Sequence, residues 1–416
     1  MPCVSPRICP LFVLCAVEFL ERLVGYLVAS SLVLYMNEAH HLSASDATHL
    51  AGWLFGLSYA AAIAGGALLN WRLGPRTATL LGLTALSLAL CGTIAAPTVP
   101  LWLPGTLFIA GNGLFKPGIV MLLHAALPFG DPNRSTGFTW FYVAVNLGGV
   151  CAPPLGAAVQ SRLGWPSVAL AAGLVMGCAA VVLAAGWRVL RHAPRTLQAA
   201  DTGSQRHRPP RPALLFLLLL ALAIHCTLYA QSTSTLLLWA RDSARRQVLD
   251  WTIPPTFFAA LPPAIVLAGA PALSALWRML AARGREPADF TKIALGLAIN
   301  GAAYAVMLLA SLFTPDTLAS PLWLVACKVA LTVGEMLLFP SALAMLGSLA
   351  PQHRSGLAMG LSFCAQAAGF WLGGLVGMRW GSWPPVTFFA ALMGIGFSTS
   401  AVVALYAGRH NTPRRA

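Results

Sequence analysis

The chain has 416 residues, of which 58% are hydrophobic and only 9% are charged, and it carries a formal net charge of +14. Soluble globular domains contain about 25% charged residues, so this composition excludes most soluble enzymes and binding proteins. Hydrophobic stretches of about twenty residues, each long enough to cross about 30 Å of hydrocarbon, follow one another along the chain and predict an all-α polytopic membrane protein.

Polar or Pro/Gly-rich residues separate these stretches into twelve predicted spans. The one long hydrophilic segment contains six arginines and has six spans on each side of it. We therefore expect an N-terminal six-helix bundle over residues 1–187, a cytoplasmic basic linker over 188–211 and a C-terminal six-helix bundle over 212–416. The predicted spans are residues 8–36, 47–71, 76–95, 100–126, 137–160, 167–187, 212–240, 252–280, 291–313, 320–349, 354–379 and 384–407.

The basic residues are distributed unevenly over the predicted loops. With both termini placed in the cytoplasm, 18 of the 26 Lys and Arg residues fall on the cytoplasmic side, 5 on the outer side and 3 within spans. Cytoplasmic loops of membrane proteins carry an excess of Lys and Arg, so the net charge reflects topology and not nucleic-acid binding. We expect a multi-pass protein of a bacterial-type inner membrane with both termini cytoplasmic.

Six charged residues lie in the predicted spans more than two residues from either end. An ionised side chain that faces lipid costs about 2.5 kcal/mol or more, so these residues should face the interior of a bundle or an aqueous cavity. Structural ion pairs are the alternative, but three acids and three bases on three helices are more typical of a polar cavity. They are Glu18, Glu21 and Arg22 in the first span, Lys116 in the fourth, and Lys328 and Glu335 in the tenth.

The first span carries its polar residues on two neighbouring faces. Glu18, Arg22 and Tyr26 are spaced at i, i+4 and i+8 and share one face, and Glu21 lies on the adjoining face. Arg22 therefore has two carboxylates within reach. Protonation of one carboxylate would free the guanidinium to bind an anion.

Several motifs follow one another through the first half of the chain. Residues 18–22 (EFLER), followed by Tyr26, resemble the ExxERxxYY signature of the proton-dependent oligopeptide transporter family, a branch of the major facilitator superfamily. A fainter match in the second half includes Gly334, Glu335 and Pro340. The other matches are residues 65–74 to the family's GGxxADRxxG segment, 111–117 (GNGLFKP) to GNGxFKPN, and 141–148 (FYVAVNLG) to FYxxINxG.

The resemblance implies a major facilitator fold, with two six-helix bundles around a central site, and proton-coupled uptake of di- or tripeptides by alternating access. It implies that Glu18, Glu21 and Arg22 take part in proton coupling. The residues matched to the family's peptide site are Arg22 and Lys116 for the carboxylate, Glu335 for the amino terminus, and Tyr26, Tyr59 and Asn146 for the walls of the pocket.

The positions of two of these residues support a zwitterion site without reference to any family. Lys116 lies 16 residues after Pro100, and Glu335 lies 14 residues after Pro321. Since the two spans hold corresponding places in the two halves, both side chains should reach a similar depth. A cation on one half and an anion on the other complement the two charges of a peptide.

The seventh span departs from the family pattern. Ala230 and Gln231 stand where the family has a glutamate before a glutamine, and Ala29 replaces the basic partner of that glutamate. Both ends of a salt bridge are absent together, which predicts an outer gate held by packing at this point. Asn70 and Trp71 likewise replace the aspartate and arginine of the helix-two segment.

Three further polar residues are candidate site residues. His225 either shuttles protons or is hydrogen-bonded packing. Lys328 is either a new substrate contact or an element of a gate, and it is too far from Glu335 along the helix to pair with it directly. Gln231 is the remaining member of the helix-seven pair.

Proton-coupled uptake of small peptides or peptide-like zwitterions is the leading functional prediction. The alternatives are a proton-coupled exporter of drugs or metabolites, and a non-transporting membrane sensor or scaffold. The sequence has no HExxH motif, nucleophile with a base, or P-loop, so we expect no enzyme activity, no metal and no cofactor. The expected partners are a small-molecule substrate, protons and the lipid bilayer, with no nucleic acid, and the expected state is a monomer.

Overall fold

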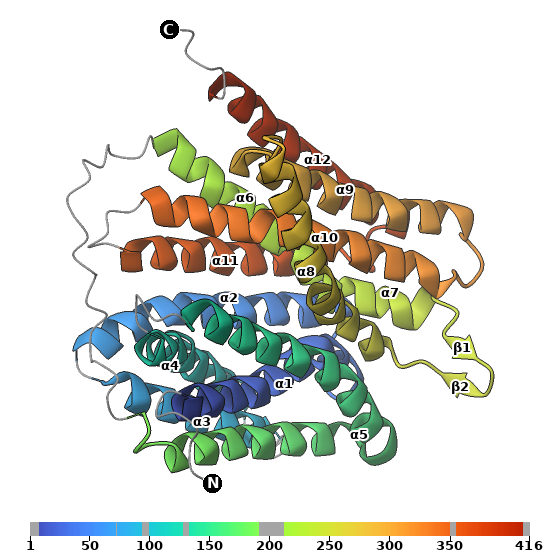
Figure 1. The fold of residues 1–416 in the computed structure, drawn as a ribbon. Helices are drawn as coiled ribbons and strands as arrows, with labels where there is room; N and C mark the ends of the chain where they lie inside the picture. The colour runs from blue at the N-terminus through green and yellow to red at the C-terminus, as the bar shows by residue number, and fades with distance from the viewer. Residues whose placement is uncertain are drawn as a thin grey trace, which may run out of the picture. The chain divides into compact units, whose positions relative to one another are not determined.

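The computed structural model describes residues 8–71, 73–93, 100–127, 133–190, 212–349 and 355–410. These residues are almost entirely helical, with one short antiparallel hairpin of β1 (Gln247–Val248) and β2 (Trp251–Thr252) (Figure 1). Within the described ranges, nine segments are long and apolar enough to cross a membrane. The protein is therefore an all-α polytopic membrane protein, as its hydropathy predicted. Residues 191–211 of the predicted linker lie outside the described residues.

The helices divide between two compact units, one made of residues 1–35 and 54–202 and the other of residues 36–53 and 203–416. The helices of the first half of the chain are α1 (Ile8–Glu38), α2 (Ala44–Trp71), α3 (Pro75–Gly92), α4 (Trp102–Ala126) and α5 (Arg134–Ala185). Those of the second half are α6 (Pro212–Ala230), η2 (Gln231–Thr233), α7 (Thr235–Ser243), η3 (Pro255–Ala260), α8 (Leu261–Ala282), α9 (Asp289–Phe313), α10 (Pro321–Leu349), α11 (Ser355–Gly377) and α12 (Pro385–His410).

Two of the predicted spans are joined at a kink, and a third is interrupted. The spans predicted at 137–160 and 167–187 are two helices that meet at a kink within α5, where Gly164 adopts φ 77° and ψ 176° and turns the chain. The span predicted at 212–240 is interrupted, because α6 ends at Ala230 and α7 begins at Thr235. With α5 counted as two spans and α6 with α7 as one, the helices follow the predicted spans in order.

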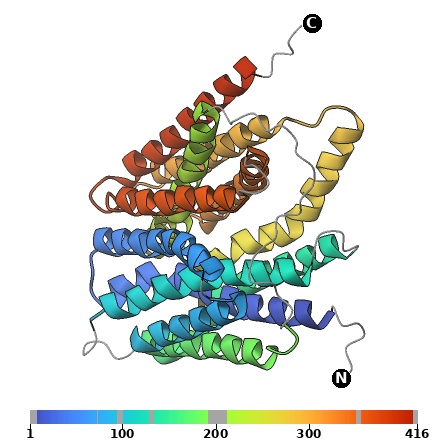
Figure 2. The same ribbon diagram turned by 90° about the vertical axis from the view of Figure 1, so that its left-hand side faces the viewer.

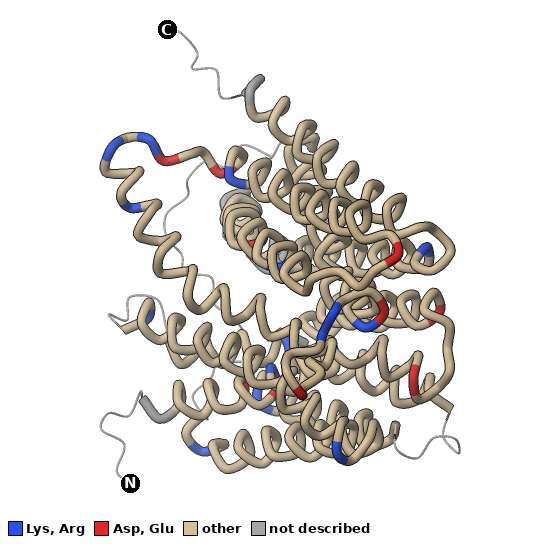
Figure 3. The backbone as a smooth tube through the Cα atoms, turned by 90° about the vertical axis from the view of Figure 1, so that its right-hand side faces the viewer, with Lys and Arg blue, Asp and Glu red and all other residues tan. Residues whose placement is uncertain are grey.

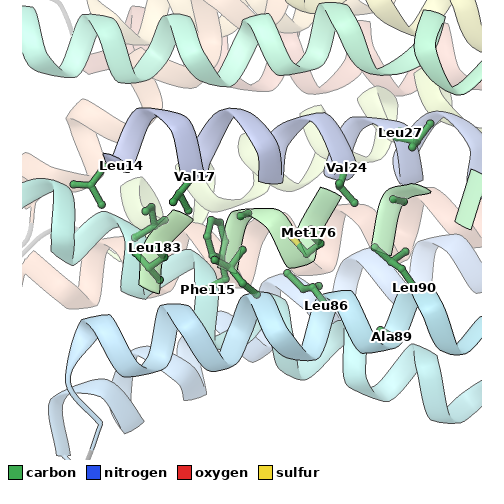
Figure 4. Packing of buried hydrophobic residues seen from close by; sticks show 14 of the residues in the cluster. Leu14, Val17, Val24, Leu27, Leu86, Ala89, Leu90, Phe115, Met176 and Leu183 are labelled. Atoms are coloured by element: carbon green, nitrogen blue, oxygen red, sulfur yellow. The ribbon is translucent and has the colours of Figure 1, made fainter. Parts of the chain in front are cut away.

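The core of the first unit is built on an apolar stripe of α1. Leu14, Val17 and Val24 are fully buried there and recur at helical spacing, so they share one face of the helix. This face packs against α3, α4 and α5, and it leaves Glu18 and Arg22 on the adjoining face. The labelled partners in Figure 4 are Leu86, Ala89 and Leu90 on α3, Phe115 on α4, and Met176 and Leu183 on α5.

The second unit is centred on α9, which packs against both α10 and α12, while α11 packs against α6 (Figure 2). Its core includes Leu218 on α6, Leu297 on α9, Leu338 on α10 and Val403 on α12, all fully buried. Charged residues are sparse along the helices of the described chain (Figure 3). Those that do lie within helices therefore stand out against an apolar background.

Residues 36–53, at the end of α1 and the start of α2, belong to the second unit. A Cβ atom on Gly52 would lie 2.5 Å from Cα of Gly374 in α11, so the two backbones are in direct contact. Next to this contact, the rings of Trp53 and Trp371 meet with their centroids 5.9 Å apart. Helices α1 and α2 thus each contribute residues to both units.

The backbones of α2 and α4 also meet without intervening side chains. A Cβ atom on Gly65 would lie 1.8 Å from the carbonyl oxygen of Gly113. Small residues at such positions let membrane helices approach closely and gain van der Waals contact. This contact fixes α4, and with it Lys116, against α2, which carries Tyr59.

We predict that Gly65→Ala lowers the thermal stability of the purified protein, because the added methyl group must push α2 and α4 apart. Overpacking of this kind costs about 1–3 kcal/mol. Gly66→Ala is the matched control, since a Cβ atom there meets nothing closer than Pro117 Cβ at 3.8 Å. Equal unfolding temperatures for the parent and Gly65→Ala in the same detergent would contradict the contact.

Candidate functional site

A three-residue ion cluster occupies the middle of α1. The guanidinium of Arg22 donates to both carboxylate oxygens of Glu21, at 2.5 Å from Nε and 2.6 Å from Nη2. Its Nε also lies 3.3 Å from Oε1 of Glu18, one turn earlier. Glu18 Oε2 is buried and has no hydrogen-bond partner among the described residues. The structure therefore places both acids on Arg22, with the bidentate contact made by the sequence neighbour Glu21.

Lys116 on α4 belongs to the same polar region. Its Nζ lies 3.6 Å from the centroid of the Tyr59 ring, which is close enough for a strong cation–π interaction. The charges that act on it are those of Arg22, Glu21 and Glu18. No ion pair involves Lys116 within the described part of the chain, so the ring of Tyr59 is in direct contact with its ammonium group while the two carboxylates act from farther away.

Two more predicted site residues lie on elements that pack against this cluster. Asn146 on α5 is buried and donates from Nδ2 to the carbonyl oxygen of Tyr142 at 2.9 Å. Two residues further on, a Cβ atom on Gly148 would lie 2.8 Å from the carbonyl oxygen of Phe19, so α5 lies directly on α1. Tyr26 is half-buried and packs at the edge of the apolar core.

In the second unit, Glu335 on α10 is half-buried and its carboxylate accepts a hydrogen bond from the hydroxyl of Tyr229 on α6. His225, one turn before Tyr229, is almost fully buried, and its Nδ1 lies 2.8 Å from Nδ2 of Asn300 on α9. The imidazole packs against the rings of Tyr229 and Phe339, with centroid distances of 5.7 and 6.3 Å. His225 is thus held in one orientation by a hydrogen bond and two aromatic rings.

Gln231 is fully buried at the break in the seventh span, which covers residues 212–243, comprises α6, η2 and α7, and is called helix seven below. Its Nε2 donates to the carbonyl oxygen of Gly373 on α11 at 2.9 Å, and its Oε1 accepts from the hydroxyl of Thr235 at 3.0 Å. Lys328 on α10 is also fully buried, and its Nζ donates to the carbonyl oxygen and the hydroxyl of Ser232. Lys328 therefore bonds a backbone carbonyl at the break between α6 and α7, whereas Gln231 joins this break to α11.

Close packing at the end of α6 is combined with an ion pair at the end of α7. Ala230 packs tightly, since a Cβ atom on Gly373 would lie 2.6 Å from the Ala230 Cβ. At the end of α7, Arg241 donates to the side-chain oxygen of Asn37 at 2.6 Å and lies 3.6 Å from the Glu38 carboxylate. Packing at Ala230 is thus supplemented by an ion pair at Arg241.

Some residues of these clusters are not among those predicted from the sequence. Tyr229, Asn300 and Ser232 are each bonded directly to a predicted site residue. The only sequence signal for Ser232 is the run of five polar residues at 231–235 (QSTST) inside an apolar span. No group of three or more His, Cys, Asp or Glu side chains that would hold a metal occurs among the described residues.

The model of the Major Facilitator Superfamily matches residues 14–374, which is most of the chain. The fold agrees with this match. A solved structure described as the peptide transporter POT in complex with sulfate superposes with a TM-score of 0.87, covers 96% of this chain and 94% of its own, and is 22% identical in sequence. The chain therefore belongs to the Major Facilitator Superfamily.

Similar sequences narrow the classification within that superfamily. A peptide transporter of Yersinia enterocolitica is 27% identical over 86% of this chain and 85% of its own. Dipeptide and tripeptide permease B of Edwardsiella piscicida is 26% identical over 88% of this chain and 86% of its own. These relatives confirm the resemblance to the proton-dependent oligopeptide transporters that the motifs of the first half predicted.

The unequal bonding of the two carboxylates to Arg22 generates a prediction about stability. Glu21→Gln removes a charge and one of two short hydrogen bonds, so we expect it to destabilise the purified protein by about 1–3 kcal/mol. Glu18→Gln removes only the longer contact and places a neutral amide where one carboxylate oxygen has no partner, so its effect should be smaller. Thermal unfolding at neutral pH measures both. A larger loss for Glu18→Gln than for Glu21→Gln would contradict the observed geometry.

Proposed function

We propose that the protein takes up di- and tripeptides, or peptide-like zwitterions, by alternating access coupled to the entry of protons. The observation that carries this proposal is that the two cations of the first unit, Arg22 and Lys116, have different partners. Arg22 is already held by two carboxylates, whereas Lys116 rests on the Tyr59 ring with no ion pair among the described residues. Lys116 is therefore the cation open to an anionic substrate group, and Arg22 becomes a second one when a carboxylate releases it.

Proton coupling follows from competition for Arg22. Protonation of Glu18 or Glu21 weakens the hold of that acid on the guanidinium, which then binds the carboxylate of the substrate. The substrate carboxylate in turn takes the place of the acid and favours its protonation. Since coupling between two binding events is reciprocal, proton binding and substrate binding promote each other.

The second unit supplies the complementary charge. Within the residues that the structure describes, Glu335 is bound by a phenol hydroxyl and forms no ion pair, which leaves its negative charge available to the amino group of a substrate. Tyr26, Tyr59 and Asn146 line the same site in this proposal. The relatives described above are named as peptide transporters and permeases, which favours peptide uptake over a drug exporter or a non-transporting scaffold.

The membrane arrangement is part of the same proposal. The excess of basic residues in one set of loops supports a bacterial-type inner membrane with both termini and the segment 188–211 in the cytoplasm. The chain then forms an N-terminal bundle over 1–187 and a C-terminal bundle over 212–416. It works as a monomer and needs only its substrate, protons and the bilayer, without a cofactor and without enzyme chemistry.

Uptake of labelled dialanine into proteoliposomes tests both the function and the coupling. Under an inward proton gradient the parent protein should accumulate dialanine, and without a gradient it should only equilibrate it. Glu18→Gln should lose accumulation but retain exchange of dialanine at equal pH, because exchange needs no net proton movement. Glu286→Gln, which alters an acid paired with Lys292 away from the cluster, is the control. Absence of any dialanine uptake by the parent protein would refute the proposal, and full accumulation by Glu18→Gln would refute the coupling role.

A blocked dipeptide tests the two charged poles separately from coupling. N-acetyl-dialanine amide has neither the amine nor the carboxylate, so it should compete with labelled dialanine much more weakly than dialanine does. Each lost partner leaves Lys116 or Glu335 uncompensated, at a cost of several kcal/mol. Competition by the blocked and free dipeptides at the same concentrations measures this. Equal potency would rule out recognition of the termini by these two residues.

A further inference from the structure

The break between α6 and α7 places polar side chains and an irregular turn of the backbone inside an apolar span. Between α6 and α7 the chain forms one 3-10 turn, Gln231–Thr233, and Ser234 then adopts φ −124° and ψ −96°. The segment 212–243 is otherwise among the most apolar of the candidate spans. Backbone groups freed by such a break must find partners within the protein, because the hydrocarbon offers none.

Lys328 provides the partner for this break from the neighbouring helix α10. Its Nζ donates to the carbonyl oxygen of Ser232 at 2.7 Å and contacts the Ser232 hydroxyl at 2.8 Å. The side chain is fully buried and both of its acceptors belong to the protein. Lys328 is therefore an internal contact between α10 and helix seven, and its ammonium group does not face an open surface.

None of the described carboxylates pairs with Lys328 to balance a permanent charge. The groups that it bonds are the carbonyl oxygen and hydroxyl of Ser232, and its sequence neighbour Cys327 is a thiol. Cysteine thiols and tyrosine phenols, which occur around Lys328, are ordinarily neutral near pH 7. The titratable or charged side chains described on the elements around it are Cys327 and Glu335 on α10, Asp289, Lys292 and Tyr304 on α9, His225, Cys226 and Tyr229 on α6, the Arg241–Asp242 pair on α7, Arg278 at the far end of α8, and Cys364 on α11.

Position 328 holds a lysine, although lysine is rare in this chain. Only three of the 26 basic residues are lysines, at positions 116, 292 and 328, and all others are arginines. Arginine keeps its proton in proteins, whereas a buried lysine exchanges it. Lys292 is bound to Glu286 at 2.6 Å, so its charge is balanced. Lys328 has the same exchangeable group without a counter-ion.

We infer that Lys328 is a proton-binding site of the transporter and that its proton is one of those carried with the substrate. The reaction is simple proton exchange, in which the ammonium form releases one proton to water and becomes the amine. As an ammonium group, Lys328 donates to both oxygens of Ser232 and holds the break of helix seven to α10. As an amine, it accepts a hydrogen bond from the Ser232 hydroxyl and binds the carbonyl oxygen less strongly.

This site extends the proposed function, on which it rests, to the second unit. Lys328 lies seven residues before Glu335 on α10, about 10 Å along the helix axis. The outer piece of helix seven, α7, begins two residues after Thr233 and ends next to Arg241, which binds Asn37 and Glu38. A change in the hydrogen bond between Lys328 and Ser232 therefore acts at the start of α7. The end of this nine-residue helix is already held by the contacts of Arg241.

Nitrogen NMR of the full-length protein labelled at lysine Nζ tests proton binding without any transport assay. Three lysines give three signals, and Lys328→Arg identifies the one from Lys328. We expect the Lys328 signal to change between its ammonium and amine forms within the pH range in which transport is measured, while the Lys292 signal stays that of an ammonium group. A Lys328 signal that remains in one form throughout that range would overturn the inference, whether or not the protein transports dialanine.

Transport by variants tests whether this proton is carried. With an inward gradient of one pH unit and no membrane potential, each coupled proton raises the limiting accumulation of substrate about tenfold, since one pH unit corresponds to about 1.4 kcal/mol. Lys328→Arg keeps the charge and the donors but cannot release a proton, so it should lower the limiting dialanine accumulation about tenfold. Lys328→Met should do the same, and Lys292→Arg is the matched control.

The two roles of Lys328 are separated by the arginine variant. A purely structural tether at Ser232 would be restored by arginine, so parental accumulation by Lys328→Arg would overturn the inference. If the parent protein itself moved no dialanine, the proposed function would fail, and the NMR titration would still decide whether Lys328 binds and releases a proton.

Discussion

Charge inside an apolar protein must be balanced locally, and this constraint determines how the functional residues of this chain are held. Four charged side chains within the described helices are held in four different ways. Arg22 is shared by two carboxylates, Lys116 rests on an aromatic ring, Glu335 accepts from a phenol, and Lys328 binds the oxygens of a broken helix turn. These partners are weaker than a dedicated bidentate ion pair, except at Arg22, so a proton or a substrate group can replace them at modest cost.

Close helix packing gives these charged groups fixed positions. Gly65 with Gly113 brings the backbones of α2 and α4 together, and Gly148 brings α5 onto α1. The apolar stripe of α1 sets the rotation of that helix, because Leu14, Val17 and Val24 occupy the core. As a result the side chains of Glu18 and Arg22 are oriented by their neighbours before any ligand is bound, which reduces the ordering cost of binding.

Hydropathy and spacing are sufficient to predict most of the fold and the cluster on α1. The spans follow from the length of apolar segments, and the contact of Glu18 with Arg22 follows from the i, i+4 rule. Spacing does not reveal that Glu21 makes the bidentate contact, because this depends on how the long Arg22 side chain folds back. The bond between Lys328 and Ser232 joins residues 96 positions apart, and no local pattern encodes it. The side chains of Asn70 and Trp71 lie outside those the structure describes.

The hairpin formed by residues 36–53 makes the two halves of the chain depend on each other. Although it lies far before the basic linker in sequence, Gly52 rests on Gly374 and Asn37 binds Arg241, both in the second half. A fragment that ended in the linker would carry this hairpin without its partners, and the complementary fragment would expose the matching glycine surface of α11. Two such fragments produced together would have a ready means of recognising each other, so complementation of a split gene is favoured over independent folding of either half.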